Sequence, residues 1–295
     1  MIPPDAAGIG GSDMVIEAQV RVGLATRGKL RGKRAAIVGL AIVGATVLVA
    51  GISAVWTPHS TTAVFPNTSF AAPSLVHPLG TDQYGRDELS RLMVGAQITL
   101  VQAALAVLIA AVIGLPVGLL AAQYGKGAEE VLMRGVDILY AFPAVLLATM
   151  LAATFGSSTV TATVAVGVAY SPVFARVTRS AARQVLKQNY VLAAKAYGRG
   201  GAAILRRHVI PNVAWLIVVQ GAVLMSLAIL AGSALSYLGL GTAPPTPSWG
   251  RMLEVAQAYL YNDPWLAIWP SVAIAGLVLG FNLLGELLQE ALSPA

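Results

Sequence analysis

The chain has 295 residues, of which 57% are hydrophobic and 11% are charged, and its mean hydropathy is +0.74. A soluble domain carries about 25% charged residues, so this composition predicts an all-α integral membrane protein with the lipid bilayer around it and no nucleic-acid partner, despite the net charge of +6. Because the chain holds no cysteine, disulfides, thiolate metal sites and cysteine nucleophiles are excluded.

Six apolar segments are long enough to cross a bilayer, because a transmembrane helix needs about 20 mostly apolar residues. An uncharged run of roughly 38 residues at 138–175 accommodates two of them, and "FGSSTVT", Phe155–Thr161, predicts the turn between these two. The stretch "PPTP", Pro244–Pro247, cannot lie inside a helix and separates the last two. In chain order the predicted spans are 35–56, one within 92–125, two within 138–175, about 212–234, and 264–285.

Lys and Arg are concentrated in two segments that six spans place on the same side of the membrane. The opposite loops hold only Arg86, Arg91 and Arg251. The positive-inside rule therefore predicts that the N- and C-termini are cytoplasmic. The clustered residues are Arg21, Arg27, Lys29, Arg31, Lys33 and Arg34, then Arg176, Arg179, Arg183, Lys187, Lys195, Arg199, Arg206 and Arg207. The predicted parts are a tail (1–34), a first helix (35–56), an extracytoplasmic loop (57–91), a five-helix core (92–290) containing a cytoplasmic loop (176–211), and a C-terminal tail (291–295).

The basic stretch "YVLAAKAYGRGGAAILRRHVIPN", Tyr190–Asn212, lies in that cytoplasmic loop, and local rules predict two short helices in it. Asn189 is a good N-cap residue and Gly198 a good residue just beyond a helix end, so a helix is expected between them. A glycine pair then breaks the chain, and 202–208 can form a second helix before Pro211 starts the fifth span. These rules leave open whether the stretch is only a solvated basic loop.

The same stretch resembles the EAA loop of ABC-importer permease subunits, in which Glu-Ala-Ala is followed by three further residues, then Gly, and later an apolar residue and Pro. Leu192 stands in the place of the family's Glu. The residues that fit the pattern are Ala193, Ala194, Gly198, Ile210 and Pro211.

Four further stretches resemble the C-type permease subunit of dipeptide and oligopeptide importers, and they occur in the order expected for that family. They are "HPLGTDQYGRDELSRLMVGAQITL" (His77–Leu100), "VDILYAFPAVLL" (Val136–Leu147), "ALSYLGLGTAPPTPSWGRML" (Ala234–Leu253) and "FNLLGELLQEALSP" (Phe281–Pro294). The resemblance covers the chain from about Ala35 to its end, whereas residues 1–30 carry none.

The resemblance implies an ABC type I importer permease fold in the bacterial plasma membrane, and a non-enzymatic role in an ATP-driven importer of di- or oligopeptides. The implied partners are a homologous second permease, two ATPase subunits that hold ATP and magnesium, and an extracytoplasmic substrate-binding protein. The implied ATPase-coupling residues are Leu192, Ala193, Ala194, Lys195, Gly198, Arg199, His208 and Pro211. A stiff pair of short helices fixed to two spans can transmit a push, which agrees with the local interpretation.

Two motifs are assigned structural rather than chemical roles. "GLATRGKL", Gly23–Leu30, nearly matches a Walker A loop, but Leu30 replaces the magnesium-binding Ser or Thr and no apolar strand precedes it. No cofactor site is therefore expected in this chain. Asp82, Asp87 and Glu88, with His77 near them, could hold a metal, but a hydrogen-bonded, docked loop is the favoured interpretation and no metal site is predicted.

Within the spans, Asp137 and Glu286 are expected near cytoplasmic ends, where pairing with Arg134 or a neighbouring subunit is favoured over a proton relay. Two further patterns predict close helix packing, within the chain or at a seam between permeases, and an interfacial amphipathic helix. They are the pairs Gly114/Gly118 and Gly276/Gly280, and the stretch Trp249–Trp265.

Two alternative functions are kept open, and a third is disfavoured. The same scaffold could import nickel or another small solute. An ATP-independent secondary carrier would need broken spans, which Pro116 and Pro143 could provide, although no charge lies near the middle of a predicted span. A membrane enzyme is disfavoured, because the sequence contains no HExxH and no GxSxG motif.

Overall fold

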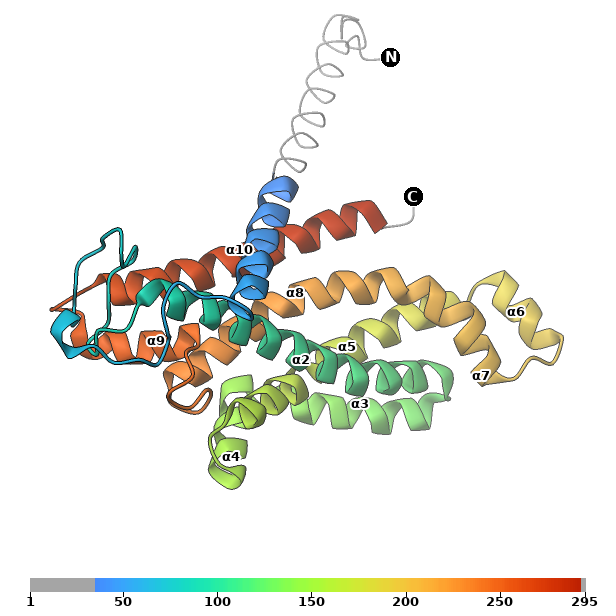
Figure 1. Ribbon diagram of the computed structural model, residues 1–295. Coiled ribbons are helices and arrows are strands. Elements are labelled where there is room, and N and C mark those ends of the chain that lie inside the picture. Colours follow the sequence, from blue (N-terminus) through green and yellow to red (C-terminus); the bar gives the residue numbers. More distant parts are fainter. Residues whose placement is uncertain (1–34, 293–295) are drawn as a thin grey trace, which may run out of the picture.

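The computed structural model describes residues 35–292, and within that range it is helical with connecting loops (Figure 1). The predicted tail 1–34, including the Walker-like stretch 23–30, and residues 293–295 of the C-terminal tail lie outside the described residues. The helices are a first helix (Ala35–Ser53), η1 (Pro66–Thr68), α2 (Glu88–Gln123), α3 (Lys126–Ala141), α4 (Ala144–Phe155), α5 (Thr159–Leu186), α6 (Asn189–Ala196), α7 (Gly201–Ile204), η2 (Leu205–Val209), α8 (Ile210–Tyr237), α9 (Trp249–Ala256), η3 (Gln257–Tyr259) and α10 (Trp265–Leu292).

The number of apolar spans agrees with the prediction, but the third span has a different shape. Five helices are individually long and apolar enough to cross a membrane, and α3 with α4 makes a sixth candidate that is bent by 86°. The break falls at Phe142 and Pro143, because proline lacks an N–H and pushes the residue before it into the extended conformation that Phe142 adopts. Helix α3 also begins at Lys126, well before the expected start of the span at residue 138.

Pro116 behaves differently from Pro143, and the expectation that it could break the second span is wrong. It lies inside α2, which continues to Gln123. The neighbouring helix α5 packs along this part of α2, and such packing allows a proline to be tolerated within a membrane helix.

Helices α2 and α5 share the most extensive helix–helix contact of the described chain, and small residues let them approach closely. A Cβ atom added to Gly114 would lie 2.6 Å from the Phe174 Cβ, and one added to Gly118 would lie 2.9 Å from the Thr178 Cβ. Both glycines therefore pack within this chain. In the second predicted pair, Gly280 packs against Ile42 of the first helix, whereas nothing in the described chain lies within 4 Å of a Cβ at Gly276.

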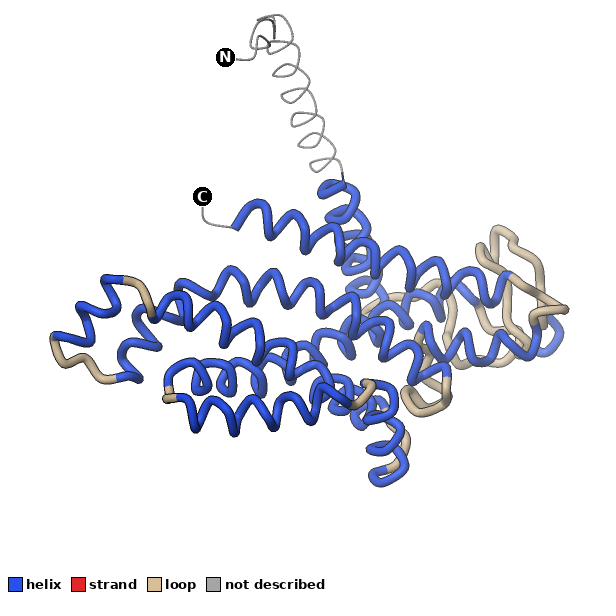
Figure 2. Tube along the Cα trace, turned by 180° about the vertical axis from the view of Figure 1, so that it is seen from behind, coloured by secondary structure: helices blue, strands red, loops and turns tan. Residues whose placement is uncertain are grey.

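The connecting segments gather at two opposite ends of the helices (Figures 1 and 2). At one end, the long loop after the first helix lies beside α9 and η3, where the Phe70 and Tyr259 rings are 5.4 Å apart. At the other end, α6 and α7 project beyond the neighbouring helices. The first end holds the loops predicted to be extracytoplasmic, and the second end holds residues 187–209, predicted to be cytoplasmic, which we call the coupling segment.

The amphipathic helix expected at the membrane interface is α9, and it is docked on the protein through Trp249. The Trp249 side chain is 3% exposed, and its Nε1–H donates to the Leu92 carbonyl oxygen of α2 at 2.9 Å. The indole also lies over Gly95, where an added Cβ would be 2.7 Å from the Trp249 Cδ1. The helix is thus a fixed part of the core at this end.

Replacing Trp249 with phenylalanine is expected to destabilise the protein by about 1 kcal/mol, because the Leu92 carbonyl loses its indole donor inside a buried contact. The measurement is thermal unfolding of the purified complex in detergent. Trp56→Phe is the matched control, since Trp56 is 60% exposed and its indole makes no hydrogen bond within residues 35–292. Equal shifts of the two melting temperatures would contradict the anchoring role of Trp249.

Candidate functional site

The candidate site is the coupling segment, predicted from the sequence to be cytoplasmic and to couple to an ATPase subunit, and its first element is α6. This helix begins at Asn189, with Gln188 in the N-cap position and no side-chain cap. The expectation that Asn189 is the N-cap is therefore wrong by one residue. The physical reason is the short connection, because α5 ends at Leu186 and only Lys187 and Gln188 separate the two helices.

The C-terminal end of α6 confirms the predicted role of Gly198. Its φ is +77°, a conformation in which a side chain is strained. The Gly198 N–H donates to the Lys195 carbonyl at 2.9 Å, and the Arg199 N–H donates to the Ala194 carbonyl at 3.1 Å. These two bonds form a Schellman motif, which satisfies carbonyls that the end of the helix would leave without a partner.

The second short helix is present as α7, but it is shorter than expected and is continuous with the following span. From α7 the chain passes through the π turn η2 directly into α8, whose first turn contains Pro211. At the other side, α5 extends to Leu186, so residues 176–186 of the predicted loop 176–211 belong to that helix. The connection between α6 and α7 is 197–200.

A cluster of buried apolar side chains fixes α6 and α7 to the spans on both sides. It joins α5, α6, α7, η2 and α8, so the coupling segment is not a free loop. Its members are Ala182, Leu186, Val191, Ile204, Val209 and Val213. Each lies on the inner face of its element, and all are less than a tenth exposed.

The coupling residues implied by the resemblance lie mostly on the outer face of this segment. Leu192 is 49% exposed, and the neighbouring Tyr197, which is not among the implied residues, is 89% exposed. The His208 ring is half-buried and lies 5.9 Å from the Tyr190 ring. Ala194 is also half-buried, and the remaining implied residues are exposed: Ala193, Lys195, Gly198, Arg199 and Pro211.

An open groove of about 560 Å³ lies between α5, the start of α6 and α8. Gln184, Gln188 and Asn212 contribute polar groups to it, and Tyr190 and Trp215 contribute aromatic ones.

Ion pairs connect the broken span to α5, and they differ from the predicted ones. Asp137 accepts from Arg176 at 2.7 Å, and not from Arg134, which lies 3.9 Å from Glu130. The Arg176 guanidinium also lies 4.0 Å from the centre of the Tyr140 ring. The arginines lie on α5 and the acids on α3, a long-range pairing that local spacing does not show.

Glu129 of α3 forms the second part of this connection, since it pairs with both Arg179 and Arg183 of α5. Its Oε1 accepts from the Arg183 guanidinium at 2.6 Å. Glu286, the other acid singled out within the spans, is exposed and makes no ion pair within residues 35–292.

Two of the three acids singled out in this loop, Asp82 and Asp87, form side-chain hydrogen bonds, in agreement with the docked loop that the sequence favours, whereas Glu88 is buried at the start of α2. Asp82 accepts from the Tyr84 and Arg86 backbone N–H groups at 2.9 Å each and from the Arg86 Nε at 2.7 Å. Asp87 caps α2 by accepting from the Ser90 N–H at 2.8 Å. Burial raises the pKa of Asp87, but hydrogen bonds from Ser90 and His77 outweigh it and the pKa is lowered overall.

His59 is a neighbour of Asp87 that the sequence analysis did not single out. Its Nδ1 lies 3.6 Å from the Asp87 Oδ1, while the His77 Nδ1 lies 2.9 Å from the same oxygen. The two histidines are separated by a loop without regular spacing, so no local pattern could have connected them.

The described chain combines helices long enough to cross a membrane, a docked loop region at one end and an anchored pair of short helices at the other. The chain belongs to the family described as "Binding-protein-dependent transport system inner membrane component", whose model matches residues 114–295. It is therefore a multi-pass plasma-membrane permease subunit with no catalytic site of its own, and ATP is hydrolysed by separate subunits.

Relatives and solved structures agree with this membership. The chain is 35% identical to the dipeptide transport system permease protein DppC of Alkalihalophilus pseudofirmus, over 90% of this chain and 88% of that protein. It is 40% identical to the glutathione transport system permease protein GsiD of Pectobacterium atrosepticum, over 75% of this chain and 74% of the relative.

Among solved structures, an inward-facing MetNI methionine ABC transporter matches with a TM-score of 0.57 and 19% identity, over 69% of this chain and 96% of that one. An amino acid ABC transporter solved with histidines matches with a TM-score of 0.55 and 19% identity, over 68% and 94%. These likenesses show the ABC type I importer permease fold. Family membership implies a second permease, ATPase subunits and a binding protein, and it sets aside the ATP-independent carrier.

Proposed function

We propose that this permease carries small peptides into the cell and that α6 with α7 couples it to an ATPase subunit. The cargo is inferred from the two relatives above, which are named for dipeptide and glutathione transport. Dipeptides and glutathione are both short peptide-like molecules, so we assign a small peptide as the cargo. The second permease completes that path, and the binding protein delivers the peptide to the extracytoplasmic end.

The observation that carries the coupling role is the two-sided character of α6. Val191 on the inner face packs in the buried cluster, whereas Leu192 of α6 and Tyr197 just beyond its end leave large side chains uncovered. Leaving apolar surface in contact with water is unfavourable. Exposed apolar residues beside small ones are typical of a surface that a partner covers. Ala193 and Ala196, three residues apart on one exposed face, leave room for the partner to approach closely.

ATP and magnesium are assigned to the two ATPase subunits in this proposal, and this chain contributes the mechanical connection. When the ATPase subunits close, α6 moves with them, and the buried cluster transfers that movement to α5 and α8. The missing family glutamate at Leu192 removes one polar contact, while the helix, its cap and its small face remain.

The direct test is uptake of a radiolabelled dipeptide into proteoliposomes that contain the complete complex, its binding protein and internal ATP. Uptake that requires both ATP and the binding protein is expected, with unlabelled dipeptide as competitor and nickel ions as the comparison cargo. ATP-dependent uptake of nickel without any dipeptide uptake would overturn the peptide assignment and leave the importer class intact.

Ala193→Trp is expected to reduce co-purification of the ATPase subunits at least tenfold, because the indole prevents close approach to the exposed face of α6. Retention is measured by quantitative mass spectrometry of the affinity-purified complex. Ala258→Trp is the matched control, since Ala258 is also exposed but lies beside α9 at the other end of the molecule. Full ATPase retention in the Ala193 variant would show that the partner does not contact this face.

A further inference from the structure

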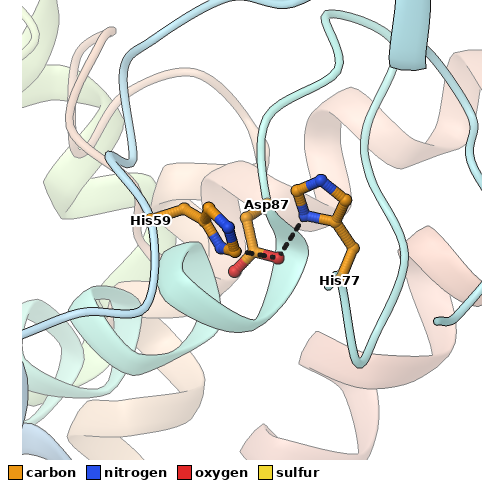
Figure 3. Close-up of side chains that lie close together, drawn as sticks. All are labelled: His59, His77 and Asp87. Atoms are coloured by element: carbon orange, nitrogen blue, oxygen red, sulfur yellow. Dashed lines mark hydrogen bonds and ion pairs between the residues drawn. The ribbon is translucent and has the colours of Figure 1, made fainter. Parts of the chain in front are cut away.

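Outside the coupling segment, two imidazoles and one carboxylate come together at the extracytoplasmic end. His59 follows the first helix, His77 lies in the middle of the long loop, and Asp87 caps α2, so three separate segments contribute one side chain each (Figure 3). One potential ligand atom from each of the three lies within 4.8 Å of the others. The rings of the two histidines are 4.7 Å apart.

The carboxylate of Asp87 is oriented so that one oxygen is left for the histidines. Its Oδ2 accepts from the Ser90 N–H at 2.8 Å and from the Ser90 hydroxyl at 2.7 Å. Its Oδ1 faces both Nδ1 atoms, at 2.9 Å for His77 and 3.6 Å for His59. Ser90 also fixes the backbone of His59, whose N–H donates to the Ser90 Oγ at 3.0 Å.

One polar atom of the cluster is buried without a hydrogen-bond partner. The His59 Nδ1 is buried and makes no hydrogen bond, because 3.6 Å to Asp87 is too long. The neighbouring arginines do not supply a cation to Asp87, since the Nε atoms of Arg86 and Arg91 lie 2.7 and 3.6 Å from Asp82 instead. The unpartnered His59 Nδ1 thus faces the same carboxylate oxygen that is hydrogen-bonded to the His77 Nδ1 at 2.9 Å.

We propose that His59, His77 and Asp87 bind a zinc ion, with water at the fourth position. Imidazole nitrogen and carboxylate oxygen are zinc ligands, whereas calcium and magnesium take sets made of oxygen. Tetrahedral zinc with bonds of about 2.0–2.1 Å separates its ligand atoms by about 3.3 Å, and the two distances to the Asp87 Oδ1 lie on either side of that value. The two histidine side chains are 36% and 16% exposed, which gives water access to the open position.

The ion would give the loop a structural role. It would connect the chain just after the first helix to the N-terminus of α2, two segments that are otherwise joined here through Ser90. Because Ser90 holds the second carboxylate oxygen, it acts as the outer partner that orients a metal ligand. The expected site is one that fixes the extracytoplasmic end of the permease, not one that carries cargo.

The test is zinc binding by the complete transporter, purified with a histidine-free affinity tag, treated with a chelator and titrated with zinc chloride by equilibrium dialysis. The chain has three histidines, and the third, His208, lies in η2 next to α7 and provides the matched control. Wild type and His208→Ala are expected to bind one zinc ion more per complex than His59→Ala. The affinity of the site should fall at least about 100-fold when this ligand is removed.

Two further measurements keep the proposal open to refutation. Asp87→Asn retains an oxygen that caps α2 but lacks the charge, so a folded Asp87→Asn complex that loses zinc supports the site. Zinc should raise the melting temperature of the wild type and of His208→Ala, but not that of His59→Ala. Equal zinc content in wild type and His59→Ala, or equal loss in His208→Ala, would overturn the proposal. So would preferential binding of calcium chloride by the same residues.

Discussion

Gly198→Val is expected to abolish most peptide uptake while the complex still hydrolyses ATP. The φ of +77° at Gly198 closes α6, and a side chain in the left-handed region costs about 1–2 kcal/mol, more when it is β-branched. No atom lies within 4 Å of a Cβ at this position, so the effect comes from the backbone and not from a clash. Loss of the cap frees 197–200, and movement of the ATPase subunits no longer reaches α5 and α8.

The measurement is the ratio of peptide transported to ATP hydrolysed in proteoliposomes, and a decrease of about tenfold or more is expected. Gly200→Val is the matched control, because Gly200 has an ordinary φ of −65° and also has no atom within 4 Å of an added Cβ. If both variants lower the ratio equally, the strained turn at Gly198 is not the coupling element. If neither variant lowers the ratio, the segment is only a basic loop that sets the orientation of the chain in the membrane.

Gly114→Leu is expected to prevent stable assembly of the permease. The Cβ alone would come 2.6 Å from the Phe174 Cβ and also into contact with the Ser171 carbonyl, so α2 and α5 must separate. Overpacking of a core costs about 1–3 kcal/mol when the surroundings can adjust, and a backbone carbonyl adjusts less readily than a side chain. A large loss of purified complex and a melting temperature lower by several degrees should result.

Gly276→Leu provides the comparison, because Gly276 also lies within a span, in the other small-residue pair, but has nothing within 4 Å of an added Cβ in the described chain. Yield and melting temperature in detergent should stay near those of wild type. A Gly114→Leu complex as stable as Gly276→Leu would mean that α2 and α5 do not pack as closely as described.

Hydropathy and local backbone rules predicted the features that depend on short stretches of chain. The order of the six apolar segments follows from apolar length, and the end of α6 follows from Gly198, because a helix end is decided by a few neighbouring residues. Pro143 was a candidate break for the same local reason, and the break is there.

Features that join distant segments could not be predicted in this way. Asp137 pairs with Arg176 of another helix rather than with Arg134 on its own helix, because the packing of α3 on α5 decides which arginine it meets. Pro116 does not break α2, because its environment is set by α5. His59 joins Asp87 only after the loop has folded, so the sequence showed the metal-binding potential of His77 and Asp87 but not the contribution of His59.

The unbroken course from α7 through η2 into α8 has a mechanical consequence. This helical stretch covers Gly201–Tyr237, 37 residues, and at 1.5 Å per residue it is about 55 Å long. A rigid lever of that length needs to rotate by only about 5° at its coupling end to displace its far end by about 5 Å, nearly the pitch of an α-helix. In the proposed coupling, a small tilt of the coupling segment is therefore enough to move the opposite end of α8 by about one helical turn.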